Sequence, residues 1–382
     1  MIWRCPTLSK LQSILSANAV DFINSNHLSF QQVKAINAIS SCRTNNMGSH
    51  KLSCDCGHEK VIQNSCGNRH CPTCGTFKKE LWVLQQQQSL LPSHYFHLVF
   101  TLPDTLRSLI YFNQEVLYDL MYKAASKTLL DLSAAKHSVT PGFSLILHTW
   151  SQTLGYHPHL HCVLAGGGIS LDGSHFESFK KKFFIHVKIL SSVFRGKFLQ
   201  SLKLLFLQDQ LKLPDDLPHD TFTSFLDGLY NKDWIVFSKP VFKCAAHVLK
   251  YLGRYTHRVA ISDYRILEVT DSEVSFSYMD NKDGGKKKVM TLSTYDFIHR
   301  FLMHILPYKF VKIRHYGFLS NRFRSVKVAL CRKFIARQRG LVLRLDALPT
   351  KLELLIKLIG KDKLCCPNCG NFFSYSHEVN PT

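Results

Sequence analysis

The chain has 382 residues, of which 45% are hydrophobic and 12% aromatic, so it can bury a sizeable core in more than one domain. Its uncharged apolar runs stop short of the about 18 residues that a membrane-spanning helix needs, and the start MIWRCPTLSKLQ lacks the apolar core of an export signal. These features argue against a membrane protein and an exported one, and we expect a cytoplasmic protein with no membrane partner.

The formal net charge is +21, with dense basic patches at residues 180–182, 286–288 and 314–339. Such a surface attracts polyanions through counterion release, and aromatic side chains interleaved with it, such as Tyr316 and Phe323, can stack on unpaired bases. We therefore expect a nucleic acid as partner. The alternative for the lysine runs is that they only keep the surface soluble.

Apolar residues recur at helical spacing from Leu8 to Ser41, with a break near residues 24–29. This pattern predicts two helices that form a scaffold. A further helix is predicted for residues 77–91.

A cysteine-rich segment separates these helices. Six of the thirteen cysteines lie between residues 42 and 74, and without an export signal they indicate metal ligands in a reducing compartment rather than disulfides. Cys71-Pro-Thr-Cys74-Gly is a zinc-knuckle sequence, in which a turn lets two sulfurs reach one ion. We expect one structural zinc site from Cys54, Cys56, Cys71 and Cys74. A second site would draw on Cys42, His50, Cys66 and His70.

The pairing of these ligands is open, because Cys54 and Cys56 are closer than the usual two-residue spacing. One ion with spare ligands is the alternative to two ions. Near the carboxyl terminus Cys366-Pro-Asn-Cys369-Gly, with Cys365 beside it, is another half-knuckle. It is completed by the amino-terminal cluster, by another subunit, or by nothing.

The middle of the chain predicts an α+β domain. Residues 95–102 form an apolar strand stopped by Pro103, a long helix follows over 105–135, and a second strand covers 143–149. Together with the next strand, this order predicts an antiparallel sheet with the site at its centre. Residues 171–176 form a hairpin turn, and FFIHV at 183–187 is strand-like and leads into helical stretches.

The segment YHPHLHCVLAGGG at 156–168 contains the most informative motif. On a strand, His159 and His161 point to the same face at a spacing suited to sharing one cation, and His157 has the same parity. The glycines at 166–168 end the strand and admit backbone or a ligand. The alternative is a partly buried strand that happens to contain histidines.

Residues 245–255, AAHVLKYLGRY, predict a helix on which Tyr251 and Tyr255 face one side, four residues apart. Arg254 and Arg258 lie beside them and can bind phosphate as bidentate forks. Two phenols so placed can reach the same small target. Packing of a half-buried helix face is the alternative.

The remaining elements are predicted as a strand at 259–269, a hairpin from 274 to 292, a helix over 295–305 and a basic helix ending near Arg339. We expect three regions. They are a helical and zinc-binding domain at 1–92, a domain carrying the histidine strand and the tyrosine helix at 93–306, and a basic carboxyl-terminal region at 307–382.

Taken together, these motifs resemble the insertion sequence 91 family of two-tyrosine HUH transposases, which have an amino-terminal transposase zinc-binding domain. The resemblance covers nearly the whole chain. Besides the two motifs above, it rests on CRTNNMGSHKLSCDCG, NSCGNRHCPTC, YFHLVFTLP, KYLGRYTHRVAISDYRI, MTLSTYDFIHRFLMHILP and RHYGFLSNRFR. HUH denotes two histidines around a hydrophobic residue, here His159, Leu160 and His161.

The resemblance implies a central HUH-type sheet and cleavage and rejoining of single-stranded DNA at transposon ends and target in rolling-circle-type transposition. The paired nucleophiles match Tyr251 and Tyr255. The catalytic ion, Mg²⁺ or Mn²⁺, would be held by His159, His161 and a third ligand, for which His157 is the first candidate and Gln152 and His148 follow. DNA contacts are expected from Arg254, Arg258, Arg314 and Arg322, with the protein on the nucleoid when bound to DNA.

Two alternatives belong to other classes. One is a plasmid replication initiator or relaxase with the same nicking chemistry, against which the zinc region argues. The other is a zinc-dependent DNA-binding protein without catalysis. The DNA sequences recognised and the oligomeric state do not follow from the sequence.

Overall fold

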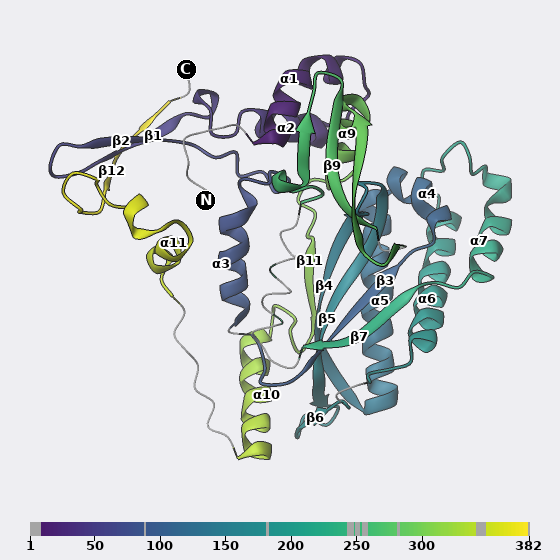
Figure 1. Ribbon diagram of the computed structural model, residues 1–382. Helices are drawn as coiled ribbons and strands as arrows, with labels where there is room; N and C mark the ends of the chain where they lie inside the picture. The colour runs from purple at the N-terminus through teal and green to yellow at the C-terminus, as the bar shows by residue number, and fades with distance from the viewer. Residues whose placement is uncertain are drawn as a thin grey trace.

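The computed structural model describes residues 9–87, 89–180, 183–242, 248, 253, 259–280, 283–340 and 349–380. These residues form an α+β structure in which three antiparallel sheets are flanked by helices (Figure 1). The predicted fold class is confirmed. Within the described ranges, no helix combines the length and the apolar character needed to cross a membrane.

The two predicted amino-terminal helices are α1 (Lys10–Asn24) and α2 (Phe30–Ser40). Each follows a serine in extended conformation whose hydroxyl accepts a backbone N–H of the first turn. Ser29 also forms a reciprocal capping box with Gln32. The two starts are thus fixed by local hydrogen bonds, independently of what the helices pack against.

The histidine strand lies at the centre of the largest sheet, as predicted. Its strand order is β11–β4–β5–β3–β7, and β6 pairs with the far end of β5. The strands are β3 (Tyr95–Thr101), β4 (Val139–Trp150), β5 (Tyr156–Ser170), β6 (Phe176–Ser178), β7 (Val236–Phe242) and β11 (Ile313–Gly317). β5 carries the histidines between β3 and β4, so side chains of both neighbours can reach them.

The glycine run at 166–168 does not end this strand, because β5 continues to Ser170. A Cβ on Gly166 would lie 2.5 Å from the His94 ring, and a Cβ on Gly168 would lie 2.6 Å from the carbonyl oxygen of Thr140. Both positions lack space for a side chain. The glycines therefore permit close packing inside the sheet, and they are not beside the histidines.

Helices cover both faces of the central sheet (Figure 1). On one face, side chains of α5 and α6 such as Tyr118 and Phe194 pack on Phe96 and Leu160 of the strands. On the other face, α10 packs through Ile335 and its neighbours onto β4 and β5. The helices are α3 (Gly75–Gln87), α4 (Arg107–Phe112), α5 (Gln114–His137), α6 (Val187–Leu207), α7 (Phe222–Tyr230) and α10 (Arg324–Arg339).

Two predictions for this part of the chain differ from the structure. The single helix at 105–135 is divided at Asn113 into α4 and α5. The segment FFIHV is not a strand, because Phe184 and Ile185 are buried in the core and His186 caps the start of α6. A short apolar run does not by itself distinguish a strand from a buried segment that leads into a helix.

The second sheet has the order β10–β9–β8 and packs with α9 against α1 and α2 in one shared core. Its elements are β8 (Ile266–Val269), β9 (Glu273–Asp280), β10 (Lys286–Ser293) and α9 (Thr294–Leu302). The predicted strand at 259–269 begins only at Ile266, because residues 263–265 form a 3₁₀ turn. In that turn Asp263 accepts the backbone N–H of Leu11 at 3.1 Å, which docks the start of α1.

The third sheet joins the two ends of the chain. In it β12 (Ser374–Val379) pairs with β1 (Ser49–Ser53), which pairs with β2 (Glu59–Gln63), and α11 (Lys351–Ile359) precedes β12. In Figure 1 the yellow β12 lies beside the dark-blue β1 and β2. The predicted carboxyl-terminal region at 307–382 is therefore not one unit, since β11 belongs to the central sheet.

The turn between β4 and β5 is held by the second sheet and its helix. Three successive carbonyls accept hydrogen bonds: Gln152 from Arg265 at 2.5 Å, Thr153 from Arg300 at 3.1 Å, and Leu154 from His304 at 3.0 Å. Because a carbonyl only accepts, Nε2 of His304 carries the proton, and the Thr149 hydroxyl lies 3.2 Å from Nδ1. The start of the histidine strand is thus fixed from outside the central sheet.

The buried His304 predicts a pH-dependent stability. Burial lowers its pKa to about 4, below the unfolded value of about 6.5. The unfolded chain binds the proton more readily, so the contribution of His304 to the free energy of unfolding should be nearly constant above pH 6.5 and should fall by about 3 kcal/mol as the pH drops to 4. Urea unfolding measured at several pH values in this range gives the free energy of unfolding as a function of pH. This free energy should depend less steeply on pH in His304→Gln than in the unsubstituted chain. Equal pH dependence in the two proteins would contradict the role given to His304.

Candidate functional site

A group of histidines lies on one face of the central sheet where β3, β4 and β5 meet. Ligand nitrogens of His148, His159 and His161 all lie within 4.8 Å of one another. The strand register explains the grouping, since His148 on β4 pairs directly with His159 on β5, and His161 follows on the same face. Three strand positions on two adjacent strands therefore form one potential metal site.

The hydrogen bonds of His159 orient its lone pair toward His161. Nδ1 of His159 donates to the carbonyl oxygen of His157 at 2.7 Å, so Nε2 is the free nitrogen. That Nε2 lies 3.2 Å from Nε2 of His161. Burial lowers the pKa of His159 to about 4, which keeps the ring neutral at physiological pH. Two imidazole nitrogens at this separation fit two positions on one ion.

A fourth histidine supports His161 from behind. Nε2 of His97 on β3 lies 3.0 Å from Nδ1 of His161, and the two rings stack at an interplanar angle of 11°. Burial lowers the pKa of His97 to about 4, so its ring is neutral. If Nδ1 of His161 donates to His97, its Nε2 is left for a metal. Sequence reasoning missed His97, although its parity on the strand 95–102 is the signal that could have found it.

His157, the first candidate for a third ligand, lies outside the group of three. Its Nδ1 is 3.3 Å from the Arg107 guanidinium and 3.8 Å from Asp104. Burial and the Arg107 charge lower its pKa. Gln152 lies in the turn that precedes β5. Strand parity alone favoured His157 as the third histidine of the group, but the structure places His148 there.

The tyrosines Tyr251 and Tyr255, with Arg254 and Arg258, lie outside the described residues. Val248 and Gly253 are described, and both are helical. Val248 is fully buried in the cluster that contains Ile146 and Val163, which lie on the same sheet face as the histidines. A Cβ on Gly253 would lie 3.0 Å from Val83 of α3.

Of the arginines expected to contact DNA, Arg314 has an intramolecular role. Its guanidinium donates to Asp119 at 2.5 Å and lies 4.1 Å above the Tyr122 ring. Arg322 is exposed and lies 5.1 Å from the centre of the exposed Phe323 ring. Arg322 and Phe323 thus present a cation and an aromatic face together to solvent.

Part of the basic helix α10 also binds the protein itself. Arg324 donates to the Gln86 side chain, Arg332 to the Leu90 carbonyl oxygen at 2.9 Å, and Arg339 to that of Pro92 at 2.7 Å. These bonds hold the end of α3 and the linker from α3 to β3 against α10. Net charge therefore overstates the number of arginines available to a nucleic acid.

The cysteines form two groups of four, and the pairing differs from the expected one. Cys42, Cys66, Cys71 and Cys74 form the first group; Cys54, Cys56, Cys366 and Cys369 form the second. Cys54 and Cys56 lie at the β1–β2 turn, away from Cys71 and Cys74, and the carboxyl-terminal half-knuckle completes their site. His50 and His70 belong to neither group. The His50 ring lies 6.3 Å from the Tyr375 ring in a tilted arrangement, and His70 accepts the Leu306 N–H.

The first cysteine group fits zinc. Its sulfurs are separated by 3.4 Å between Cys42 and Cys74 and 3.6 Å between Cys66 and Cys74. Four sulfurs at about 2.3 Å from a tetrahedral ion would be about 3.8 Å apart. Hydrogen bonding from the Cys66 thiol lowers the pKa of Cys42 to about 7, so a thiolate is accessible there. Cys42 and Cys71 are buried in the core formed by α1 and α2, so the site can stabilise that core.

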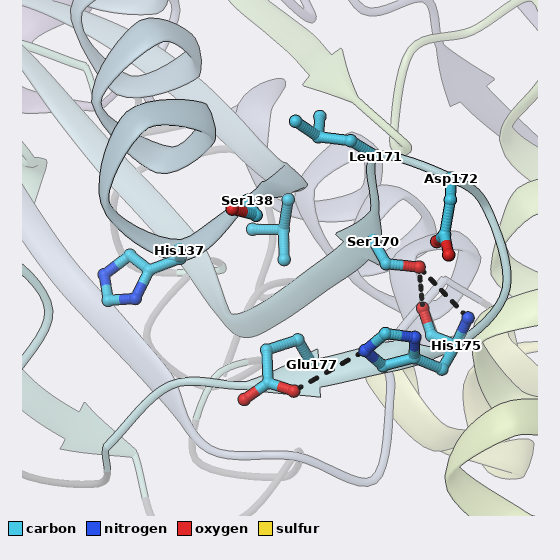
Figure 2. A pocket seen from close by; sticks show the side chains of 8 residues that line it. His137, Ser138, Ser170, Leu171, Asp172, His175 and Glu177 are labelled. Atoms are coloured by element: carbon cyan, nitrogen blue, oxygen red, sulfur yellow. Dashed lines mark hydrogen bonds and ion pairs between the residues drawn. The ribbon is translucent and has the colours of Figure 1, made fainter.

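A cavity of about 370 Å³ lies at the opposite end of β5 and is not part of the histidine group (Figure 2). It is lined by Ser138, Ser170 and His175 among others, and His175 pairs with Glu177 at 3.7 Å. Ser170 is nine residues beyond His161, or about 30 Å along an extended strand. The cavity is therefore remote from the candidate metal site.

Two family models match the chain. One, described as "Transposase zinc-binding domain", matches residues 14–102, and the other, described as "Putative transposase", matches residues 142–327. The chain is 40% identical over 349 residues to "Putative transposase y4qJ" of Sinorhizobium fredii, covering 90% of this chain and 88% of that protein. It is 28% identical over 302 residues to "Transposase for insertion sequence element IS801" of Pseudomonas savastanoi pv. phaseolicola, covering 76% of this chain and 71% of that protein. No solved structure matches the chain.

These matches define the class of protein as a transposase, which acts on DNA by cleavage and strand transfer, with an amino-terminal zinc-binding domain. The chain belongs to the insertion sequence 91 family of transposases. The resemblance drawn from its motifs is confirmed.

Zinc in the first cysteine group should stabilise the amino-terminal core. Cys71→Ser should lower the zinc content by one ion and lower the free energy of unfolding by several kcal/mol, on the order of a lost structural metal site. Elemental analysis and thermal unfolding measure both effects. Cys331→Ser is the control, because Cys331 is buried on α10 outside both groups and should destabilise the chain without loss of metal. Unchanged zinc content in Cys71→Ser would contradict the site.

Proposed function

We propose that this transposase nicks and rejoins single-stranded DNA by attack of a tyrosine on a phosphate held at the histidine group. The observation that carries the proposal is the convergence of His148, His159 and His161 within 4.8 Å on one sheet face. These residues would hold a divalent ion, which would polarise the scissile phosphate when bound. Three nitrogen ligands favour Mn²⁺ over Mg²⁺, because Mg²⁺ prefers oxygen.

The protein supplies orientation around that ion. The His157 carbonyl holds the His159 ring, and His97 holds the His161 ring, so both Nε2 atoms are aimed at one point. His148 completes the set from β4, and its ring stacks on Trp150 at 4.6 Å. A site whose ligands are fixed by strands and supporting hydrogen bonds needs little rearrangement when the ion and the phosphate arrive.

The nucleophiles would be Tyr251 and Tyr255, for which the family membership and the burial of Val248 on the histidine face are the support. The tyrosine hydroxyl loses its proton as its oxygen forms a bond to phosphorus, the bond from phosphorus to the 3′ oxygen breaks, and that oxygen takes up a proton to leave as a 3′ hydroxyl. The resulting 5′-phosphotyrosine conserves the bond energy, so that another strand can be joined without ATP.

Single-stranded rather than duplex DNA is proposed as the substrate. Exposed aromatic and cationic side chains such as Arg322 and Phe323 can stack on unpaired bases and neutralise the backbone. The net charge of +21 supplies affinity for either form. Transposon ends and target would both be bound as single strands.

His148 should be essential for cleavage. His148→Ala should lower the rate of cleavage of a labelled DNA single strand in the presence of Mn²⁺ by at least about 100-fold, because a residue that binds the ion directly is lost. Binding of the strand should change little, since the basic surface supplies most of the affinity. Electrophoresis on denaturing gels measures cleavage.

The matched control is His157→Ala, which keeps the backbone carbonyl that orients His159. It should cleave within a few-fold of the unsubstituted chain. The reverse order of effects, with His157 essential and His148 dispensable, would show that His157 is the third ligand.

Tyr251 and Tyr255 should have different duties. Only an oxygen within about 3.5 Å of phosphorus can attack, and two positions four residues apart on a helix are about 6 Å apart. At least one of the single variants Tyr251→Phe and Tyr255→Phe should still form a covalent adduct, neither should complete transposition, and the double variant should form no adduct. Mass spectrometry of the trapped peptide identifies the attached residue, and a nucleotide on neither tyrosine would refute the assignment.

A further inference from the structure

We propose that Cys54, Cys56, Cys366 and Cys369 form a second structural zinc site, which fastens the carboxyl-terminal tail to the amino-terminal zinc-binding domain. The four sulfurs lie within 4.8 Å of one another. The sulfurs of Cys54 and Cys369 are 3.2 Å apart, and those of Cys56 and Cys366 are 3.5 Å apart. Cys54 and Cys56 lie within the matched zinc-binding domain, but neither matched family model extends to residue 366, so the pair Cys366 and Cys369 lies outside both models.

Each half of the site is a turn built to present two sulfurs. In the first, the N–H of Gly57 donates to the Cys54 carbonyl at 2.8 Å; in the second, the N–H of Gly370 donates to the Cys366 carbonyl at 2.9 Å. Both glycines have a positive φ, 81° at Gly57 and 79° at Gly370. A residue with a side chain would be strained there. A glycine with a positive φ therefore closes both turns, although the hydrogen bond spans three residues in the first turn and four in the second.

The backbone around the site already joins the two halves. β12 pairs with β1 over residues 374–379 and 49–53. The Lys60 ammonium donates to the Lys363 carbonyl oxygen at 3.1 Å, and the Ser374 hydroxyl donates to the Ser53 carbonyl oxygen at 3.0 Å. These contacts bring the carboxyl-terminal turn against the β1–β2 turn with the cysteines facing each other.

What the third sheet lacks is a hydrophobic core. All six residues of β12 are exposed, and β1 and β2 contribute only Ser49 as a buried residue. Cys54 and Cys366, by contrast, are buried at 6% and 2% exposure. A sheet of this size without buried apolar side chains needs another source of stability, and in small modules a metal ion commonly supplies it.

The ligand set selects zinc and a structural role. Four thiolates form a closed tetrahedral shell with no position for water or substrate, whereas the histidine group consists of nitrogens and suits a different ion. The ion would close a loop between residues 54 and 369, a sequence separation of 315. Without it, the strand pairing and a few polar contacts alone would hold the tail.

The test uses the full-length protein and counts its zinc. Elemental analysis should find two zinc ions in the unsubstituted chain and one in the double variant Cys366→Ser with Cys369→Ser. The double variant Cys54→Ser with Cys56→Ser should also retain one ion. Combining all four substitutions should still leave one, because both pairs serve the same ion.

Cys365→Ser is the matched control. Cys365 is adjacent to Cys366 but belongs to neither group of four, so this variant should keep two ions. Limited proteolysis read by mass spectrometry supplies a second measurement. Cleavage within residues 361–379 should be accelerated at least about tenfold in the variant lacking Cys366 and Cys369, and unchanged in Cys365→Ser.

Several outcomes would overturn the proposal. One zinc ion in the unsubstituted chain would do so without any variant, even if the cysteine variants failed to fold. So would two ions in the Cys366 and Cys369 variant, or the loss of a further ion when the four substitutions are combined. A loss of zinc without faster proteolysis would refute the fastening role. None of these results depends on the nicking activity.

Discussion

The register of β4 against β5 is the constraint on which the candidate site depends. It sets His148 opposite His159, and a slip of one residue would turn every histidine of β5 to the other face. Close packing fixes that register. A Cβ on Gly142 would meet the Phe318 ring at 2.3 Å, and one on Gly168 would meet the Thr140 carbonyl oxygen at 2.6 Å, so both strands are locked at the end far from the site.

The opposite end of the same hairpin is held by a different part of the chain. Arg265 in the turn before β8, Arg300 on α9 and His304 just after α9 donate to three successive carbonyls of the β4–β5 turn. Leu154 in that turn is fully buried at a positive φ of 62°, a conformation that costs energy and persists only when its surroundings enforce it. Because the second sheet shares its core with α1 and α2, the amino-terminal helices support the histidine strand indirectly. The regions expected at residues 1–92 and 93–306 are therefore connected through this shared core.

Sequence reasoning predicted what depends on local pattern. The two amino-terminal helices, the first strand at Tyr95 and the central antiparallel position of the histidine strand follow from periodicity, caps and turn residues. It failed where the answer depends on pairing between distant segments. Strand parity relates His157 to His159, but only the register with β4 reveals that His148 is closer. The grouping of the cysteines was predicted wrongly for the same reason. The pair that completes the group of Cys54 and Cys56 is about 310 residues away, and no spacing rule points to it.

The metal chemistry of this transposase follows from where each ligand type lies. The two cysteine groups lie in different surroundings: one in the core shared by α1, α2 and the second sheet, the other in a sheet without an apolar core. The histidines lie in the opposite situation, on a sheet whose core is already complete on its other face. A metal there would add little to folding, so under the proposed function the sheet would hold its imidazoles in place with coordination positions left for a phosphate. Four-sulfur groups whose metal would stabilise the fold and a nitrogen group that the fold positions can therefore coexist in one chain, because the first would serve folding and the second would serve the proposed cleavage.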